Sequence, residues 1–280
     1  MRFSRVLRAS AIAAAAGLAL AACGSGNEDG GGGSGGDGGG GAESLTIGIK
    51  FDQPGLGQKT PDGYEGFDVD VATYIAKELG VEANNIEWVE APSAERENLI
   101  KRGDVDIVVA TYSITDERKQ EVDFAGPYFI AHQDLLVRAD DSSITGPDAM
   151  NGKKLCSVTG STSAQRVKDE YSAQTDLQEY GGYSECISGL ESGAVDAITT
   201  DDTILAGLAA ANEGKFKLVG EGFSDENYGV GLEKGNTELR DDVNAAIQKM
   251  FDDGAWADAV ETHLGPAGFE VPEPPEITEK

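Results

Sequence analysis

Hydroxyl side chains and one arginine follow an apolar run, DIVVA, in the stretch DIVVATYSITDER. Thr111 and Ser113 stand just after the run, and Arg118 comes five residues after Ser113. A planar guanidinium can hold both oxygens of a carboxylate, and hydroxyl groups can complete the shell around it. The stretch therefore predicts a carboxylate-binding group at the end of a buried strand. The alternative is an ion pair between Arg118 and an acidic neighbour, Asp116 or Glu121, on the protein surface.

A second hydroxyl-rich turn and one aspartate follow two other apolar runs. The turn is TGSTS, with Thr159, Ser161 and Thr162, and the aspartate is Asp201 at the end of VDAITTD. Such a turn can open a helix, whose first N–H groups also attract a carboxylate. Asp201 suits an ammonium group, with Thr111 as a neutral acceptor beside it. Together these residues mirror an amino-acid zwitterion, and the alternative is that the turn and Asp201 are ordinary helix caps.

Apolar strands and amphipathic helices alternate from residue 45 onward. In the first half we expect strands at LTIGIKF, NIEWVEA and VDIVVATY, and helices at DVDVATYIAKELG and SAERENLIKRG. The rhythm then restarts, with strands at KKLCSVTG, LQEYGG, VDAITTD and FKLVGE and helices at STSAQRVKDEYS, YSECISGLESG and DTILAGLAAANEG. Two further helices follow, TELRDDVNAAIQKMFDDG and AWADAVETHLG. This alternation predicts an α/β fold with a mostly parallel sheet.

Two α/β units joined by two extended segments predict two lobes with two crossings between them. We expect lobe 1 to comprise residues 44–132 and 226–270, lobe 2 to comprise residues 133–225, and residues 271–280 to form a flexible tail. Ligands of open α/β sheets bind beyond the carboxyl ends of the strands. Two facing lobes therefore place a ligand in the cleft between them.

The N-terminus has the features of a secretory signal rather than of a fold. Residues 1–23 combine three arginines with a short apolar core, AIAAAAGLALAA, and end in LAAC. That ending resembles a bacterial lipobox, in which Cys23 becomes the lipidated first residue. Residues 24–43 are rich in glycine and predict a flexible tether. We therefore expect a lipid anchor that holds the folded part at the extracellular face of the cell membrane. The alternative is a plain secretory signal with an accidental cysteine.

Two cysteines, Cys156 and Cys186, remain once Cys23 is assigned to the lipid. In an oxidising compartment an even pair predicts a disulfide. Such a bridge would stabilise the fold by about 3–4 kcal/mol on the chain-entropy account. Two buried free thiols are the alternative.

The composition argues against several classes of function. A formal net charge of −28 over 280 residues gives no basic surface for nucleic acid. The cysteines, His132 and His263 lack the spacing of metal ligands, and the glycine-rich run lacks the lysine of a phosphate-binding loop. We therefore expect no metal and no cofactor. Catalysis requires a positioned acid, base or nucleophile, and structural roles are expected for both histidines, so we expect that the protein is not an enzyme. We also expect a monomer.

Four motifs resemble those of the family 3 extracellular solute-binding proteins, the amino-acid receptors of ABC importers. They are GFDVDVATYIAKELG, LIKRGDVDIVVATYSITDERKQEVDFAGPY, KLCSVTGSTSAQ and VDAITTDDTIL, and the resemblance covers residues 45–265. It implies a two-lobed periplasmic-binding-protein-like fold that closes on its ligand, and a membrane permease that reads the closed form. It also implies that Ser113, Arg118, Ser161 and Thr162 bind the α-carboxylate and that Asp201 binds the ammonium group.

The same resemblance implies a site for the ligand side chain. In relatives that bind acidic amino acids, a serine and an arginine at the spacing of Ser93 and Arg96 reach the side-chain carboxylate, and the position of Lys50 is basic. The segments FDQPGLG, PSAERE and GPYFIAHQDLLVR are especially similar to actinobacterial glutamate-binding lipoproteins. Lys50, Arg96 and Arg118 against Asp201 would complement two carboxylates and one ammonium group. We therefore expect glutamate or aspartate as the ligand, with L-glutamate first and glutamine ranked below.

Other interpretations of these residues stay open. Arg96 could pair with Glu95 or Glu97 on a helix surface, and Lys50 could have a structural role. A tethered amino-acid sensor would use the same lobe closure as a transport receptor.

Overall fold

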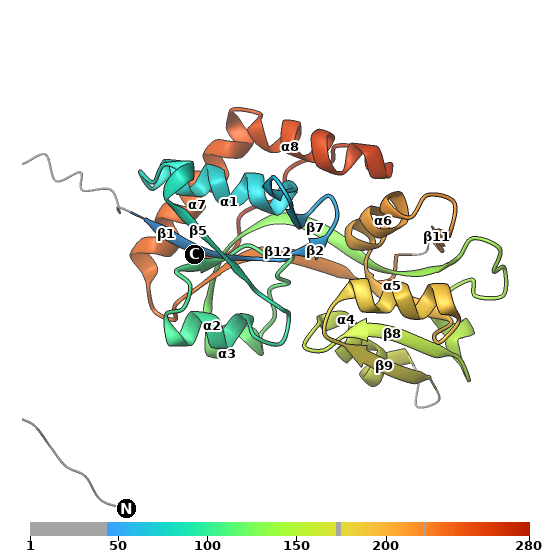
Figure 1. Cartoon of the computed structure of the whole chain (residues 1–280). Coiled ribbons are helices and arrows are strands. Elements are labelled where there is room, and N and C mark those ends of the chain that lie inside the picture. The colour runs from blue at the N-terminus through green and yellow to red at the C-terminus, as the bar shows by residue number, and fades with distance from the viewer. Residues whose placement is uncertain (1–43, 172–174, 221) are drawn as a thin grey trace, which may run out of the picture. The chain divides into compact units, whose positions relative to one another are not determined.

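The structure is a computed structural model that describes residues 44–171, 175–220 and 222–280 (Figure 1). The expected signal, the lipidated Cys23 and the glycine-rich tether lie outside the described residues. Within the described ranges, no helix is both long enough and apolar enough to cross a membrane. The fold described below is therefore that of the chain from residue 44 onward.

Lobe 1 is built on a parallel sheet covered by helices. Its centre is β1 (Leu45–Ile49), which pairs in parallel with β5 (Ile86–Glu90) and β6 (Ile107–Val108). The connection from β1 to β5 contains α1 (Phe67–Glu78), and α2 (Arg96–Arg102) connects β5 to β6. These elements form where the sequence predicts them, because their apolar residues repeat with the periods of a strand or a helix.

Short elements complete lobe 1. A small antiparallel sheet consists of β2 (Asp52–Gln53), β3 (Gly57–Thr60) and β4 (Gly63–Glu65). The helical turns are Ala83–Asn85, which is a 3-10 turn, and α3 (Arg118–Glu121). The small sheet lies between β1 and α1, the 3-10 turn lies before β5, and α3 lies after β6.

Lobe 2 repeats the parallel arrangement. Its centre is β8 (Lys154–Val158), which pairs in parallel with β9 (Asp176–Tyr180) and β10 (Ala197–Asp201). Its helices are α4 (Thr162–Arg166), continued by a π-helical turn (Val167–Tyr171), then α5 (Tyr183–Ser192) and α6 (Asp202–Ala211), with a 3-10 turn at Pro147–Met150 before β8. Each strand is thus followed by a loop at the same edge of the sheet.

Two long strands connect the lobes. β7 (Asp123–Arg138) pairs antiparallel first with β12 (Asp225–Leu232) and then with β10 and β11 (Phe216–Leu218). β12 also pairs antiparallel with β6, so one nine-stranded sheet runs through both lobes of the described chain. Figure 1 shows β7 and β12 side by side between the two groups of elements. The two-lobed α/β fold is confirmed, but the sheet is mixed rather than mostly parallel, because both crossing strands run antiparallel to their neighbours.

The last helices return to lobe 1. α7 (Thr237–Asp252) and α8 (Ala255–His263) pack on α1, and a 3-10 turn follows at Gly265–Ala267. Trp256 of α8 is buried, and its indole N–H donates a hydrogen bond to the carbonyl of Tyr128 at 2.8 Å. This bond fastens α8 to the first half of β7.

The last residues of the predicted C-terminal tail contact lobe 1. The N–H groups of Thr278 and Glu279 donate to the carbonyl of Gly126 at 2.9 and 3.0 Å. Ile277 packs against the main core, and the Asn244 amide donates to the carbonyl of Glu279. The proline-rich, acidic composition suggested fraying, but prolines fix an extended backbone that brings one isoleucine back to the fold.

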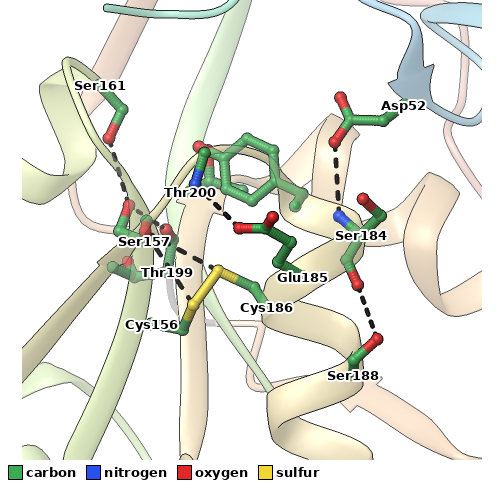
Figure 2. The surroundings of a disulfide bond; sticks show 12 residues. Asp52, Cys156, Ser157, Ser161, Ser184, Glu185, Cys186, Ser188, Thr199 and Thr200 are labelled. Atoms are coloured by element: carbon green, nitrogen blue, oxygen red, sulfur yellow. Dashed lines mark hydrogen bonds between the residues drawn. A yellow bond between two sulfur atoms is a disulfide. The ribbon is translucent and has the colours of Figure 1, made fainter.

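The predicted disulfide is confirmed, and it joins Cys156 on β8 to Cys186 on α5 (Figure 2). Both cysteines are fully buried. The bridge therefore fixes α5 against β8 near the end of the strand where the turn TGSTS begins. In the same view, Asp52 of lobe 1 accepts a hydrogen bond from the N–H of Ser184 in the first turn of α5, at 3.4 Å.

We expect the double variant Cys156→Ala/Cys186→Ala to lose about 3–4 kcal/mol of unfolding free energy on the chain-entropy account. The reason is that the bridge closes a sequence separation of 30 residues, which restricts the unfolded chain. Urea denaturation of residues 44–280 measures the loss. Added reductant should destabilise the wild type and leave the double variant unchanged, and a double variant as stable as the oxidised wild type would contradict the prediction.

Candidate functional site

A narrow cavity with a volume of about 10 Å³, roughly enough for one water molecule, lies between the lobes. Lobe 1 contributes Gln53, Ser93, Arg96, Thr111 and Ser113 to its lining. Lobe 2 contributes Ser161, Thr162, Ser163, Tyr183, Thr200, Asp201 and Ile204. Nearly all of these side chains are polar or charged. The lining therefore suits a small polar ligand that touches both lobes, and the lobes must move apart to admit one.

Asp201 supplies this cavity with a buried carboxylate. It ends β10, is 3% exposed, and does not cap α6 with its side chain, which excludes the helix-cap alternative. The hydroxyl of Tyr228 donates to it at 2.6 Å, and that of Ser163 at 3.4 Å. Burial, and next the charge of Glu226, raise the pKa of Asp201 to about 8. A cationic group of a ligand would offset both effects.

Arg96 supplies the opposite charge. Its side chain is buried, and its Nη1 donates to the carbonyls of Ala110 at 3.0 Å and Thr111 at 3.2 Å. Its guanidinium lies 4.2 Å from the centre of the Tyr112 ring. Its Nε–H is buried and has no hydrogen-bond partner within the described residues. The surface ion pair with a neighbouring glutamate is thereby excluded, and an unmet buried donor at the wall favours an anionic ligand group.

Lys50 and Ser93 form a buried pair in which the ammonium donates to the serine hydroxyl at 2.7 Å. Ser93 lines the cavity, whereas Lys50 lines a neighbouring pocket together with Asp52 and Tyr183. Burial, and next the charge of Arg96, lower the pKa of Lys50 well below its usual value. Lys50 therefore acts on the cavity through Ser93 rather than by lining it.

Arg118 connects the two lobes at the edge of the cavity. Its Nη1 donates to the carbonyl of Ser113 at 2.6 Å, and its Nη2 donates to the carbonyl of Gly160 in lobe 2 at 3.0 Å. Its Nε pairs with Glu97 at 3.3 Å, so its acidic partner is not one of the two considered from the sequence. Burial, and next the charge of Arg96, lower the pKa of Arg118 to about 10, which leaves it protonated at neutral pH. Arg118 lines the open pocket beside the cavity rather than the cavity itself.

In the turn that opens α4, the hydroxyl groups that were expected to bind a carboxylate form hydrogen bonds within the protein. Ser161 is the N-cap, and its Oγ accepts the N–H of Ala164 at 3.0 Å. Thr162 donates its hydroxyl to Glu226 at 2.9 Å, and its Oγ1 also lies 3.4 Å from the Ser113 hydroxyl. Both residues line the cavity. Their hydroxyl groups are nevertheless bonded within the protein.

Thr159, which we expected to bind the ligand, is not brought into the cavity. It is exposed, and its N–H donates to the carbonyl of Tyr180, which extends the pairing of β8 with β9. The chain turns toward the cavity only at Gly160, whose φ of 78° lies in the left-handed region. Within this turn, the residues that line the cavity begin at Ser161.

Asp68, in the motif GFDVDVA, bonds to the backbone of the cavity residue Thr111. This role was not predicted. It is fully buried and accepts the N–H of Thr111 at 2.9 Å and the hydroxyl of Tyr128 at 2.7 Å. Thr111 has a φ of 45°, which is uncommon for a residue other than glycine, so these bonds hold a strained strand end. Burial raises the pKa of Asp68 to about 6 despite the bonds it accepts.

Several other residues of the site were also missed. Gln53 accepts the hydroxyl of Thr111 at 3.1 Å, and Tyr183 is hydrogen-bonded to Thr200. Ser163 follows the predicted residue Thr162, so its position in the chain could have indicated that it belongs to the site. Tyr228 lies on β12, for which the sequence offered no signal of a role in binding.

The charge balance of the site differs from the predicted one. Glu97 offsets Arg118, and Glu226 adds a second carboxylate whose charge acts on Asp201. Arg96 forms no ion pair within the described residues. In the same described ranges, no cluster of three or more His, Cys, Asp or Glu could hold a metal ion.

The model of the bacterial extracellular solute-binding proteins, family 3, matches residues 45–266. The chain belongs to this family. Its members are binding proteins, in agreement with a cavity that both lobes line. The family predicted from the four motifs is thereby confirmed.

Two curated relatives and one solved structure illustrate the similarity. The chain is 49% identical over 233 residues to the glutamate-binding protein GluB of Corynebacterium efficiens, which is 79% of each chain. It is 37% identical over 216 residues to the ABC transporter glutamine-binding protein GlnH of Bacillus subtilis, with 76% of this chain and 78% of the relative covered. The structure of an ancestral arginine-binding protein bound to glutamine has a TM-score of 0.75 and 35% identity, covering 80% of this chain and 99% of that one.

The carboxyl group of Asp201 should titrate near pH 8 in the ligand-free protein, because burial and Glu226 both oppose its ionisation. Carboxyl-directed ¹³C NMR across this range measures the midpoint, and Asp201→Asn assigns the resonance by deleting it. Asp202→Asn is the matched control and should leave that resonance in place. A midpoint near that of an unperturbed aspartate, about 4, would contradict the prediction.

Proposed function

We propose that this protein is the receptor of an ABC amino-acid importer and that it binds L-glutamate in the cavity between its lobes. One observation carries the proposal: the buried Arg96, with an unpartnered N–H, lines the same cavity as the buried Asp201. Buried charges require counter-charges, because a charge without one keeps its full desolvation cost. An acidic amino acid supplies a carboxylate for Arg96 and an ammonium group for Asp201.

We assign the α-carboxylate to Arg118, with the hydroxyl groups of Ser113 and Thr162 turned from each other toward it. A guanidinium has five N–H donors, and Arg118 has one partner on each of its three nitrogens, so donors remain for a carboxylate. Because Arg118 already contacts Gly160 of lobe 2, a carboxylate bound here would favour the closed arrangement of the lobes.

We assign the side-chain carboxylate to Arg96 and Ser93, with Lys50 behind Ser93. A glutamine amide carries no charge, so it would leave the buried guanidinium uncompensated. Glutamate is therefore preferred over glutamine. Aspartate carries the same charges on a shorter side chain and is the second candidate.

The relatives support this choice. Identity is 49% to the Corynebacterium efficiens protein named for glutamate and 37% to the Bacillus subtilis protein named for glutamine. The second relative is an ABC transporter component by name, which supports an ABC permease as the partner. We further propose that Cys23 carries the lipid anchor, that lobe 1 and lobe 2 have the boundaries predicted from the sequence, and that the receptor is a monomer without catalytic activity.

The variant Arg96→Gln tests the side-chain assignment. Loss of one partner from a buried charge pair costs about 2–5 kcal/mol, so the dissociation constant of L-glutamate should rise by roughly 100-fold or more. The constant for glutamine should rise much less, because no ion pair with its amide is lost. Isothermal titration calorimetry of residues 44–280 with both ligands measures the two changes.

The matched control is Arg102→Gln, the same substitution on the same helix. Arg102 is exposed and pairs only with acidic residues at the surface, so this variant should bind both ligands as the wild type does. If Arg96→Gln weakens glutamate and glutamine equally, Arg96 supports the fold and not the choice of ligand. If the wild type binds neither amino acid, the proposed function is wrong.

A further inference from the structure

Glu226 is a buried carboxylate that the assignments above leave without a role. It is 2% exposed and belongs to the crossing strand β12. In the sheet it stands opposite Ala131 of β7, and two residues further along β7, Gln133 stands opposite Asp201. Glu226 therefore lies where β7 changes its neighbour from β12 to β10, which is the crossing between the lobes.

The contacts of Glu226 reach both ends of α4. Its Oε2 accepts the hydroxyl of Thr162 at 2.9 Å, and its Oε1 accepts Nη2 of Arg166 at 3.1 Å. Thr162 and Arg166 are the first and last residues of this helix. A third bond to Oε1 comes from the hydroxyl of Ser224 at 3.2 Å. One side chain on the crossing strand thus holds the whole helix that carries the binding turn.

Glu226 and Asp201 bond to successive hydroxyls of that turn, because Thr162 donates to Glu226 and Ser163 donates to Asp201. After burial, the negative charge of Glu226 raises the pKa of Asp201 most, and it also opposes the lowering of the pKa of Arg118 by burial and Arg96. Glu226 therefore acts on the residues that we assign to both charged ends of the ligand. Among the described residues, Arg166 forms an ion pair with Glu226.

Four other ionisable groups act on Asp201 from the elements around it. They are Tyr228 of β12, Asp202 of α6, Tyr183 of α5 and Arg96 of α2. Asp202 accepts the N–H groups of His132 and Thr203, and Tyr228 donates to Asp201 itself. After burial, Glu226 has the largest effect on Asp201 among these groups.

We propose that Glu226 is a positioning residue of the ligand site, which holds the binding turn of α4 on the crossing strand β12 and, through its charge, makes ligand binding depend on pH. The proposal rests on the proposed function, because it requires a ligand ammonium group at Asp201. When that group binds, a proton held by Asp201 leaves to solvent, and the ammonium charge takes its place.

The direction of the pH effect follows from this exchange. Below the pKa of Asp201, the ligand-free carboxyl group is protonated, so binding must release a proton and the affinity falls as the pH falls. The fall is at most about tenfold per pH unit. Removing the charge of Glu226 lowers the pKa of Asp201, so the same fall should begin at a lower pH.

Calorimetry with L-glutamate near pH 6 and pH 8, in buffers of different ionisation enthalpy, tests the proposal on residues 44–280. For the wild type we expect proton release and a dissociation constant roughly 10- to 100-fold larger at the lower pH. For Glu226→Gln we expect this ratio and the proton release to shrink. The matched control is Asp225→Asn on the same strand, whose side chain is 77% exposed and which should behave as the wild type.

Glu226→Asp separates the two parts of the role. It keeps the charge but shortens the side chain, so glutamate affinity should fall at both pH values while the ratio between them stays that of the wild type. A shape-only role for Glu226 would instead give weaker binding in Glu226→Gln with an unchanged pH ratio, and that result would overturn the proposal.

A measurement without ligand keeps the proposal distinct from the proposed function. The NMR midpoint of Asp201 should move to lower pH in Glu226→Gln and stay in place in Asp225→Asn. An unmoved midpoint overturns the role of Glu226 even if glutamate binds. If the midpoint moves in Glu226→Gln but the wild type binds no amino acid, the electrostatic link between Glu226 and Asp201 is supported and the proposed function is overturned instead.

Discussion

Arg96, Asp201 and Glu226 are 2–3% exposed, and a charge taken this far from water costs several kcal/mol unless partners offset it. The protein provides only part of that compensation. Arg96 has two backbone carbonyls and the face of Tyr112 but no carboxylate among the described residues, whereas Asp201 has hydroxyl donors but no cation bonded to it. The remaining cost is what a ligand of opposite charges can remove, and this links the binding of such a ligand to an arrangement in which the lobes bury these groups.

The crossing strands place this chemistry at the point where the lobes meet. β12 carries both Tyr228 and Glu226, and β7 stands next to Asp201 through Gln133. Arg118 bonds to the backbone of both lobes at the opposite edge. A hinged closure that moved one lobe would therefore change the surroundings of every charged group in the site at once, which is how a small ligand can bias a large rearrangement.

The ligand-facing end of lobe 2 is held as one piece. The disulfide fixes α5 to β8, Glu226 fixes α4 to β12, and Ser161 caps α4 from the end of β8. Asp52 of lobe 1 reaches the first turn of α5 beside this assembly. Contacts of this kind within lobe 2 would leave less ordering of the side chains to be done when a ligand binds.

The sequence by itself determined the type and order of the elements, because periods of two and 3.6 residues and the motifs at strand ends are local properties of the chain. It therefore predicted the α/β lobes, the cysteine pair, and Ser113, Thr111 and Asp201 as residues of the site. Tertiary structure alone decided which charged side chains are buried close together. It turned Arg96 inward instead of toward a neighbouring glutamate, placed Lys50 behind Ser93, left Thr159 outside, and brought Glu226 and Tyr228 from a distant strand. The cost of a buried charge depends on these neighbours, and their distances are set by the packing of elements far apart in the chain.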